Sequence, residues 1–485
     1  MGAHDAIMRP VIAALQESVM PSLSRQFAQW IADLQYEDLP PAVIDRAKGV
    51  TLQALISVLL GSRSKAGQQA VQLVVDDELG VTNGATLLVD GRKVTKGGAG
   101  FANSEMAFSG GKWDTYRMLT HPGTAIIPAA LVGAETSGAD GRAYLTAVAA
   151  AYEVMERLAS EFIPTVMSRG FHAGPVFSIF GSGIAAAKLM GCDAEQMNSV
   201  IALCASLASS NLEANRSGGR ALREGAAVRN ALLAVALAQR GHPGGETVLE
   251  GEAGFYHAYT GNNHGALTYS FTGATRVDLS RLAAGLGSDW MFLETLYRIH
   301  CTAGYNIAHI EVGAQIMREN QLRYADVERA EAVVNWLETQ YPSPAFPVRR
   351  EDLNDKAGGT AYHLAYGIAT SGFPMLNGWE KDMPREADPP EVLDLMKRIT
   401  ILPSHTMGLF APRITIFTRD GRSYTKQATG REYVFDYPEL VRRMRPVAPG
   451  LPIPAAQFDE LIAACGALDR EARADRLIGL TVKSR

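Results

Sequence analysis

The chain has 485 residues, 47% of them hydrophobic and 20% charged, with a formal net charge of −5 at pH 7. This length exceeds one ordinary hydrophobic core, so two domains are expected. The acidic balance excludes a general nucleic-acid-binding protein, and the absence of an apolar run of about 18 residues predicts no membrane-spanning helix.

The cysteines and the first residues indicate the compartment. The N-terminal segment is a poor signal peptide, because Asp5 precedes a short apolar patch that Pro10 and Glu17 interrupt. Four cysteines lie far apart without paired spacing, which favours reduced thiols over a disulfide framework or a zinc site. They are Cys192, Cys204, Cys301 and Cys465. We therefore expect a cytoplasmic protein.

The first half of the chain has a helical pattern. In the first long helix Pro41 opens and Gly61 closes the apolar periodicity. A short hairpin over 85–95, around an Asp-Gly turn, is almost the only strand signal in this half. Helices are predicted over 41–61, 67–77, 125–134, 141–161, 176–190, 195–210 and 226–241.

Strand signals appear after about residue 270. The patterns predict a helix over 309–320, a strand over 330–339, a helix over 355–370, a strand over 397–403, a hairpin over 413–427 and a helical tail over 437–478. The fold expected is mainly α: a large helical domain from both chain ends and a smaller α+β domain. The boundaries expected are 20–274 and 411–485 for the helical domain and 275–410 for the α+β domain.

The richest group of titratable residues precedes the apolar helix 125–134. A polar, glycine-broken segment there carries Lys112, Asp114, Thr115, Arg117 and His121. Pro122 and Gly123 break any earlier helix, so the histidine lies where a loop meets a helix start. Loops of this kind often hold catalytic groups, although the same pattern also occurs in loops without chemistry.

The order of several short motifs resembles the MmgE/PrpD family, which includes 2-methylcitrate dehydratase, cis-aconitate decarboxylase and iminodisuccinate epimerase. The motifs are Gly100-Phe-Ala-Asn103, Asp114-Thr115, His121-Pro122, Pro128-Ala-Ala-Leu131 and Glu135, with further similarity over about 25–470. The resemblance implies a helical domain with an α+β lid, a site in the cleft between them, and a homodimer. Apolar segments at 128–134 and 226–238 also favour a dimer.

The resemblance assigns roles to the loop. His121 matches the histidine that would transfer a proton, and histidine suits this role because its ordinary pKa lies near working pH. Asp114 and Thr115 match a pair that would orient this histidine or donate to substrate. The alternatives are that His121 caps the following helix and that Asp114 is an ordinary turn aspartate.

Three residues are candidates for a second acid. His172 matches a family histidine, with Gly174 at the position of a family threonine. In the lid, His300 stands where relatives carry a tyrosine, and Tyr305 is close enough in sequence to substitute for it. The alternative for His172 is that it satisfies the start of the next helix.

Four cations are candidates for binding a substrate anion: Lys112, Arg216, Arg220 and Arg298. Arg220 and Arg223 stand where the family has a lysine and a histidine, and an arginine binds a carboxylate bidentately but cannot give up a proton in a protein. Gly111 stands at the first loop aspartate of the family. The alternative for the 216–223 cluster is a solvated charged face.

The sequence therefore predicts a cofactor-independent lyase of the dehydratase type, acting on a small di- or tricarboxylate or hydroxy acid by proton transfer next to a carboxylate. No metal is expected, because no cluster has ligand spacing. The departures at Gly111 and Arg220 predict poor turnover of 2-methylcitrate and cis-aconitate. The alternatives are an epimerase, isomerase or decarboxylase of the same family, and an inactive member that binds a carboxylate.

Overall fold

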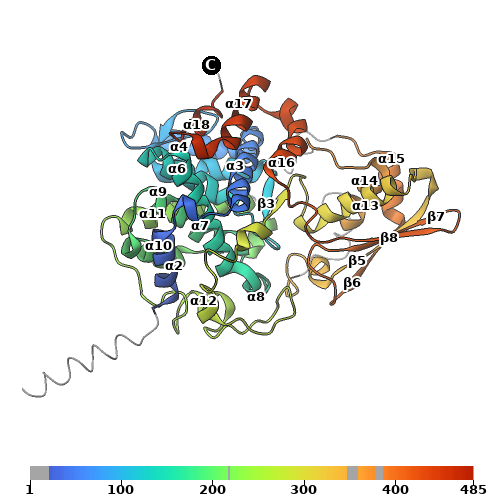
Figure 1. Cartoon of the computed structure of the whole chain (residues 1–485), viewed down its shortest axis with the longest axis horizontal. Helices are drawn as coiled ribbons and strands as arrows, with labels where there is room; N and C mark the ends of the chain where they lie inside the picture. Colours follow the sequence, from blue (N-terminus) through green and yellow to red (C-terminus); the bar gives the residue numbers. More distant parts are fainter. Residues whose placement is uncertain (1–20, 217–218, 347–358, 377–385, 484–485) are drawn as a thin grey trace, which may run out of the picture.

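The computed structural model describes residues 21–216, 219–346, 359–376 and 386–483, apart from the side chains of residues 215–221 (Figure 1). Most of the described chain is a helical body. Its N-terminal part contains α2 (Leu23–Asp33), α3 (Pro41–Gly61), α4 (Lys65–Glu78), α5 (Lys96–Ser109), α6 (Gly123–Ser137), α7 (Gly141–Ala159), α8 (Ile163–Ser168), α9 (Ala173–Leu189), α10 (Ala194–Leu207), α11 (Gly219–Ala238) and α12 (Phe255–Thr260).

The C-terminal end of the chain returns to this helical body. Its helices are α16 (Tyr437–Met444), α17 (Ala455–Gly466) and α18 (Arg476–Gly479). Both α16 and α17 pack on α3, as the red and blue ribbons of Figure 1 show. Apolar side chains from both chain ends share one core. The mainly α fold expected from the sequence is confirmed.

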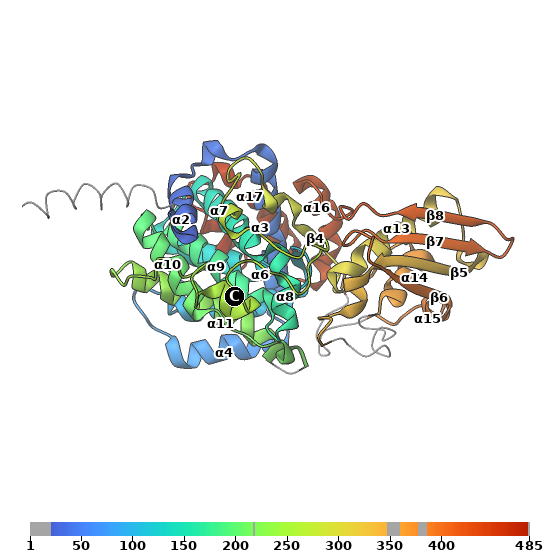
Figure 2. The ribbon, with the colours of Figure 1, turned by 90° about the horizontal axis from the view of Figure 1, so that it is seen from below.

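A second, smaller core lies at one end of the molecule, between residues 308 and 428 (Figures 1 and 2). Its four-stranded sheet has the order β6-β5-β7-β8, with β5 and β6 parallel and the other pairs antiparallel. Helices α13 and α14 pack on the sheet. The elements are β5 (Val327–Asn335), β6 (Ile399–Ser404), β7 (Arg413–Thr418), β8 (Ser423–Gln427), α13 (Ile307–Glu319), α14 (Thr360–Thr370) and α15 (Pro390–Leu395).

Most predicted elements are present within a few residues of their expected bounds. The short hairpin consists of β1 (Ala85–Thr86) and β2 (Lys93–Val94). The strand predicted over 330–339 ends at Asn335, because residues 336–340 form a 3₁₀ turn. Residues 355–358 of the helix predicted over 355–370 lie outside the described residues. The domain boundaries at 275 and 410 stay a prediction, and β7 and β8 follow residue 410 in the sequence.

Helix α5 was not expected, because glycine disfavours a helix and three glycines lie within its first turns. Gly100 explains why a helix forms here. A Cβ at this position would lie 2.6 Å from Leu232 Cδ1 and 2.8 Å from Val228 Cγ1, both in α11. The missing side chain thus lets α5 and α11 approach closely, and packing between helices outweighs local propensity.

A buried ion pair fixes the segment that leads from the helical body toward the second core. The Arg157 guanidinium pairs with Glu153 one turn earlier in α7, and both side chains are almost fully buried. Arg157 also donates to the carbonyl oxygens of Leu282, Ala284 and Asp289. The second carboxylate oxygen of Glu153 accepts the Phe292 N–H at 3.1 Å.

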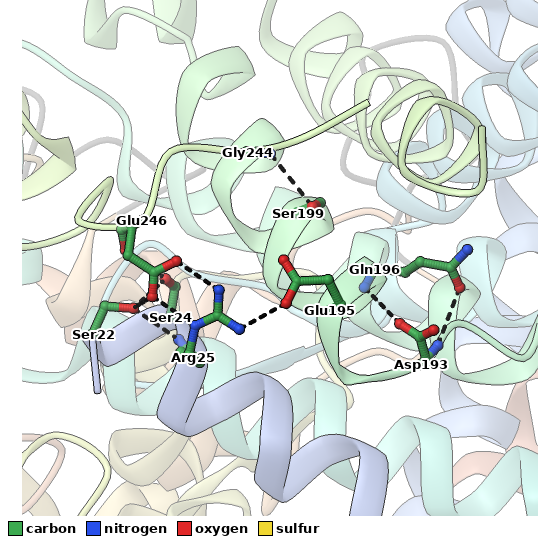
Figure 3. Close-up of polar contacts among 9 residues, drawn as sticks. All are labelled: Ser22, Ser24, Arg25, Asp193, Glu195, Gln196, Ser199, Gly244 and Glu246. Atoms are coloured by element: carbon green, nitrogen blue, oxygen red, sulfur yellow. Dashed lines mark hydrogen bonds and ion pairs between the residues drawn. The ribbon is translucent and has the colours of Figure 1, made fainter. Parts of the chain in front are cut away.

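An exposed network offers a contrast (Figure 3). Arg25 in α2 contacts Glu246 and Glu195, while Asp193 and Gln196 form a capping box at the start of α10. The Arg25 side chain is 40% exposed, and exposed ion pairs contribute little because water and salt screen them. None of the helices within the described ranges is long and apolar enough to cross a membrane.

We predict that Arg157→Met lowers the free energy of unfolding by about 3–5 kcal/mol, because it leaves the Glu153 carboxylate buried without its partner. Arg25→Met is the matched control, with an expected loss below about 1 kcal/mol. Urea unfolding followed by circular dichroism measures both. Equal losses in the two variants would contradict the prediction.

Candidate active site

A short antiparallel ladder joins the loop before α6 to the chain that enters the second core. Strand β3 (Trp113–Thr115) pairs with β4 (Leu296–Arg298), and Trp113 lies opposite Arg298. Neither strand was expected from the sequence, because each has only three residues. The ladder brings the loop residues of the predicted site against the residues that follow β4.

His121 lies buried at the end of this loop. Its Nδ1 is 3.0 Å from the backbone carbonyl oxygen of Asp114, and its ring centroid is 4.5 Å from that of Trp113. A carbonyl oxygen only accepts, so Nδ1 carries the hydrogen and Nε2 holds the lone pair of the neutral ring. This tautomer can act as a base at Nε2.

The side chain of Asp114 points to the start of α6 and not to the histidine ring. Both carboxylate oxygens accept the Gly123 N–H at 3.0 Å, and the Tyr152 hydroxyl donates to one of them. Burial raises the pKa of Asp114 to about 6, although these hydrogen bonds oppose the rise. Asp114 therefore caps α6 and positions His121 through its own backbone carbonyl.

A small cavity, about 30 Å³ in volume, lies beside the His121 ring. Thr115, Arg298 and Tyr305 line it, and the Arg298 guanidinium lies 3.9 Å from the centre of the Trp113 ring. The Thr115 hydroxyl is 3.2 Å from the carbonyl oxygens of Arg117 and Thr120. Further lining residues that the sequence did not indicate are Trp113, Tyr341 and Phe410.

Two non-glycine residues of the loop have left-handed backbone conformations. Arg117 has φ +53° and Leu119 has φ +66°, and both line the cavity. Such conformations cost about 1–3 kcal/mol each and persist only where surrounding contacts impose them. They cluster at functional sites, which supports a function for this loop.

Lys112 and His300 lie near each other, away from the lining of the His121 cavity. Both side chains are buried; Lys112 Nζ lies near the Cys301 thiol, and His300 Nδ1 has no hydrogen-bond partner within the described part of the chain. Burial lowers the pKa of Lys112, with Arg298 adding to the shift and the Cys301 thiol opposing it. Burial and the Lys112 charge likewise hold the pKa of His300 well below its usual range.

The other predicted residues lie at the starts of two helices. The His172 side chain caps α9, where its Nδ1 accepts the Gly174 N–H at 3.1 Å. This contact is the one expected if His172 satisfies the start of the next helix. It is not among the residues lining the His121 cavity. Arg216 is the last residue of a 3₁₀ turn and Arg220 is the second residue of α11, but their side chains lie outside the described residues.

Two buried acids near α11 were missed by the sequence analysis. Glu105 belongs to α5 and Glu224 to α11, and both are almost fully buried. The signal that could have identified Glu105 is an acidic residue inside the mostly apolar segment 99–108. Within the described ranges, no group of three or more His, Cys, Asp or Glu residues could hold a metal ion.

Known proteins resemble this chain over much of its length. A cis-aconitate decarboxylase-like protein, oryM, from Aspergillus oryzae is 23% identical over 316 residues, which is 63% of each chain, so the alignment spans less than two thirds of that relative. Cis-aconitate decarboxylase from Aspergillus terreus is 24% identical over 427 residues, 83% of this chain and 84% of the relative.

Cis-aconitate decarboxylase from Homo sapiens is 28% identical over 247 residues, 49% of this chain and 50% of the relative. The model of the MmgE/PrpD N-terminal domain matches residues 25–267, which is half of the chain and includes β3, His121 and His172. The chain therefore belongs to the MmgE/PrpD family.

Proposed function

We propose that this chain is a cofactor-independent lyase that acts on a small di- or tricarboxylate or a related hydroxy acid. The observation that carries the proposal is the arrangement of His121, Arg298 and Tyr305 around one cavity. It combines a base with a bidentate cation and a hydroxyl donor, which is what proton transfer next to a carboxylate requires. The cis-aconitate decarboxylases among the relatives support the same class of reaction.

In this proposal His121 Nε2 takes the proton from a carbon next to a substrate carboxylate. Arg298 holds that carboxylate, and the Trp113 ring beneath its guanidinium keeps the planar group oriented. In a dehydration the electron pair of the broken C–H bond forms the double bond, and the hydroxyl leaves as water after receiving a proton. In a decarboxylation the carbon that loses CO₂ keeps the electron pair and then receives a proton.

Further carboxylates of the substrate need further cations. Lys112 and His300 are buried near each other, so we assign them to a second carboxylate, with Lys112 as the cation and the neutral His300 as a hydrogen-bond donor. Arg216 and Arg220 remain proposed anion-binding residues. Epimerisation or isomerisation would use the same carbanion without a leaving group. An inactive member would bind the anion without proton exchange at carbon. We expect the enzyme to work in the cytoplasm.

We predict that His121→Gln lowers proton exchange at the substrate carbon by about 10²–10⁴-fold, the usual contribution of a positioned base. The measurement is deuterium incorporation in D₂O, followed by NMR, with citrate, cis-aconitate, 2-methylcitrate and malate as probes. His264→Gln, at an exposed histidine, is the control and should exchange like the wild type. Unchanged exchange in His121→Gln would contradict the role of this residue.

We predict that Arg298→Lys raises KM about 10- to 100-fold with a smaller effect on kcat. The lysine loses the second parallel hydrogen bond to the carboxylate, and hydrogen bonds to charged groups contribute about 1.5–3 kcal/mol. Arg329→Lys is the matched control, because the Arg329 guanidinium also lies over an aromatic ring, that of Phe417, but on the sheet. An unchanged KM in Arg298→Lys would count against carboxylate binding here.

We also propose that the protein is a homodimer. Residues 128–134 are covered within the protomer and need no partner. Exposed leucines on two helices that pack on α5 support the proposal instead: Leu73 in α4, and Leu222 and Leu233 in α11. Large apolar side chains left exposed in this way would be covered in an interface between two copies of the chain.

Light scattering at micromolar concentration should therefore give the mass of a dimer, and Leu233→Arg should give that of a monomer. Leu402→Arg, at an exposed leucine of β6 in the second core, is the control and should stay dimeric. A monomeric wild-type protein would contradict the proposal.

A further inference from the structure

Two buried carboxyl groups lie close together where α5 and α11 pack. Glu105 Oε1 accepts the Gly225 N–H at 3.1 Å, and Glu224 Oε2 accepts the Ser178 hydroxyl at 2.9 Å. Glu224 is fully buried, and its Oε1 has no hydrogen-bond partner among the residues that the structure describes. A buried oxygen left in this way is unfavourable unless it carries a proton or gains a partner.

A missing side chain makes room for the Glu224 carboxyl. A Cβ at Gly174 would lie 2.5 Å from Glu224 Oε1 and 3.1 Å from His172 Nδ1. The carboxyl therefore lies beside His172 at the start of α9, and any larger residue at position 174 would displace it. Gly174 stands where the family resemblance places a threonine. The glycine at this position leaves the space that the Glu224 carboxyl occupies.

The surroundings raise the pKa of both carboxyl groups to neutral pH or above it. Burial raises the pKa of Glu224 to about 7, with Asp114 adding to the rise and Arg223 opposing it. Burial and the Glu224 charge raise the pKa of Glu105 to about 8. Glu105 thus still carries its proton when Glu224 gives one up, and the pair avoids two buried charges.

The groups that face Glu224 come from several elements. They are Glu105 of α5, His172 at the start of α9, Asp114 of β3 and Arg223 of α11 itself. The 3₁₀ turn that packs on α11 also carries Glu213 and Arg216. The Arg223 guanidinium lies 5.8 Å from the centre of the Phe108 ring, whose centroid is 6.5 Å from that of His121. The Phe108 ring therefore lies between the start of α11 and the proposed base.

The other candidate acids are poorly suited to donate a proton. His172 Nδ1 accepts a backbone N–H, which keeps its ring neutral. Burial lowers the pKa of His300 and raises the pKa of Tyr305, so the first carries no proton to spare and the second holds its proton too tightly. An acid works best when its pKa is near the operating pH.

We propose that Glu224, held beside Glu105, is the proton donor of this site and takes the part that a lysine at position 220 would have. The inference rests on the proposed lyase function. The O–H bond of Glu224 breaks and its electron pair stays on the carboxylate, which Arg223 stabilises. The proton passes to the leaving hydroxyl or to the carbon that has lost CO₂, and water returns a proton to Glu224.

Infrared spectroscopy of the full-length protein tests the proton on Glu224 without any substrate. The carbonyl stretch of protonated carboxyl groups should decrease as the pH rises through about 7, and Glu224→Gln should remove this step. Glu105→Gln should retain this step and reduce the later one near pH 8, to which the buried Glu338 also contributes. Because loss of the Glu224 charge lowers the pKa of Glu105, the deciding variant carries both Glu224→Gln and Glu105→Gln. A step near pH 7 that persists in this double variant would overturn the proposal.

Kinetics test the donation itself, with the probe acids used for His121. The wild-type kcat should fall as the pH rises through about 7, and Glu224→Gln should lower kcat about 10²–10⁴-fold and abolish this limb of the pH profile. Glu224→Asp, which keeps a carboxyl, should restore part of the rate. Glu156→Gln, at a buried acid of α7 with a raised pKa, is the matched control and should behave like the wild type.

Failures of the two proposals are distinguishable. Circular dichroism verifies that each variant folds. If Glu224→Gln retains the wild-type kcat and pH profile while His121→Gln loses turnover, Glu224 is not the donor and the lyase proposal stands. If the wild-type protein turns over no probe acid and exchanges no carbon-bound proton, the lyase function and the donor role that depends on it are both wrong, whatever the infrared titration shows.

Discussion

The antiparallel pairing of Trp113–Thr115 with Leu296–Arg298 is the contact on which the site depends. One strand ends in the loop that holds His121, and the other continues into the chain that carries Tyr305. Without this ladder, Arg298 would not lie over Trp113 and Tyr305 would not face the cavity. The buried pair of Arg157 and Glu153 supports the same arrangement, because it fixes the segment that precedes β4.

Burial of ionisable groups is the second constraint. Around the site, burial raises the pKa of Asp114, Glu224 and Glu105 and lowers the pKa of Lys112 and His300. All five shifts favour the uncharged form. These five groups therefore contribute little net charge to the empty site. Because the site is buried, a charge on the substrate or the transition state interacts strongly with the fixed dipoles and cations around it.

Local signals in the sequence were sufficient for most of the long helices and for placing His121 at the start of α6. Pro122 and Gly123 mark the start of α6, and the long apolar periodicities mark α3 and α7. Helix α5 was missed because its glycines disfavour a helix locally, and only packing against α11 shows why they are there. The three-residue strands β3 and β4 have too few residues to show an alternation.

Side-chain direction was harder to predict than position. The aspartate expected to orient His121 does so with its backbone oxygen, while its carboxylate caps α6. Trp113 and Tyr341 line the cavity from segments far apart in the sequence. Nothing in the local pattern around Tyr341 connects it to the loop, because that connection exists only after the two cores are joined.

Two departures from the family motifs, Gly174 and Arg223, lie near the same group, the Glu224 carboxyl. Considered separately, an arginine at position 220, an arginine at 223 and a glycine at 174 read as losses of a proton donor, a histidine and a hydroxyl. In the structure the glycine makes room for the Glu224 carboxyl, and the positive charge of Arg223 opposes the effect of burial on it. A buried acid needs both space and a compensating charge. Substitutions that supply the two together are what a relocated proton donor would require, whereas a site that had lost its chemistry would have no need to keep a carboxyl buried there.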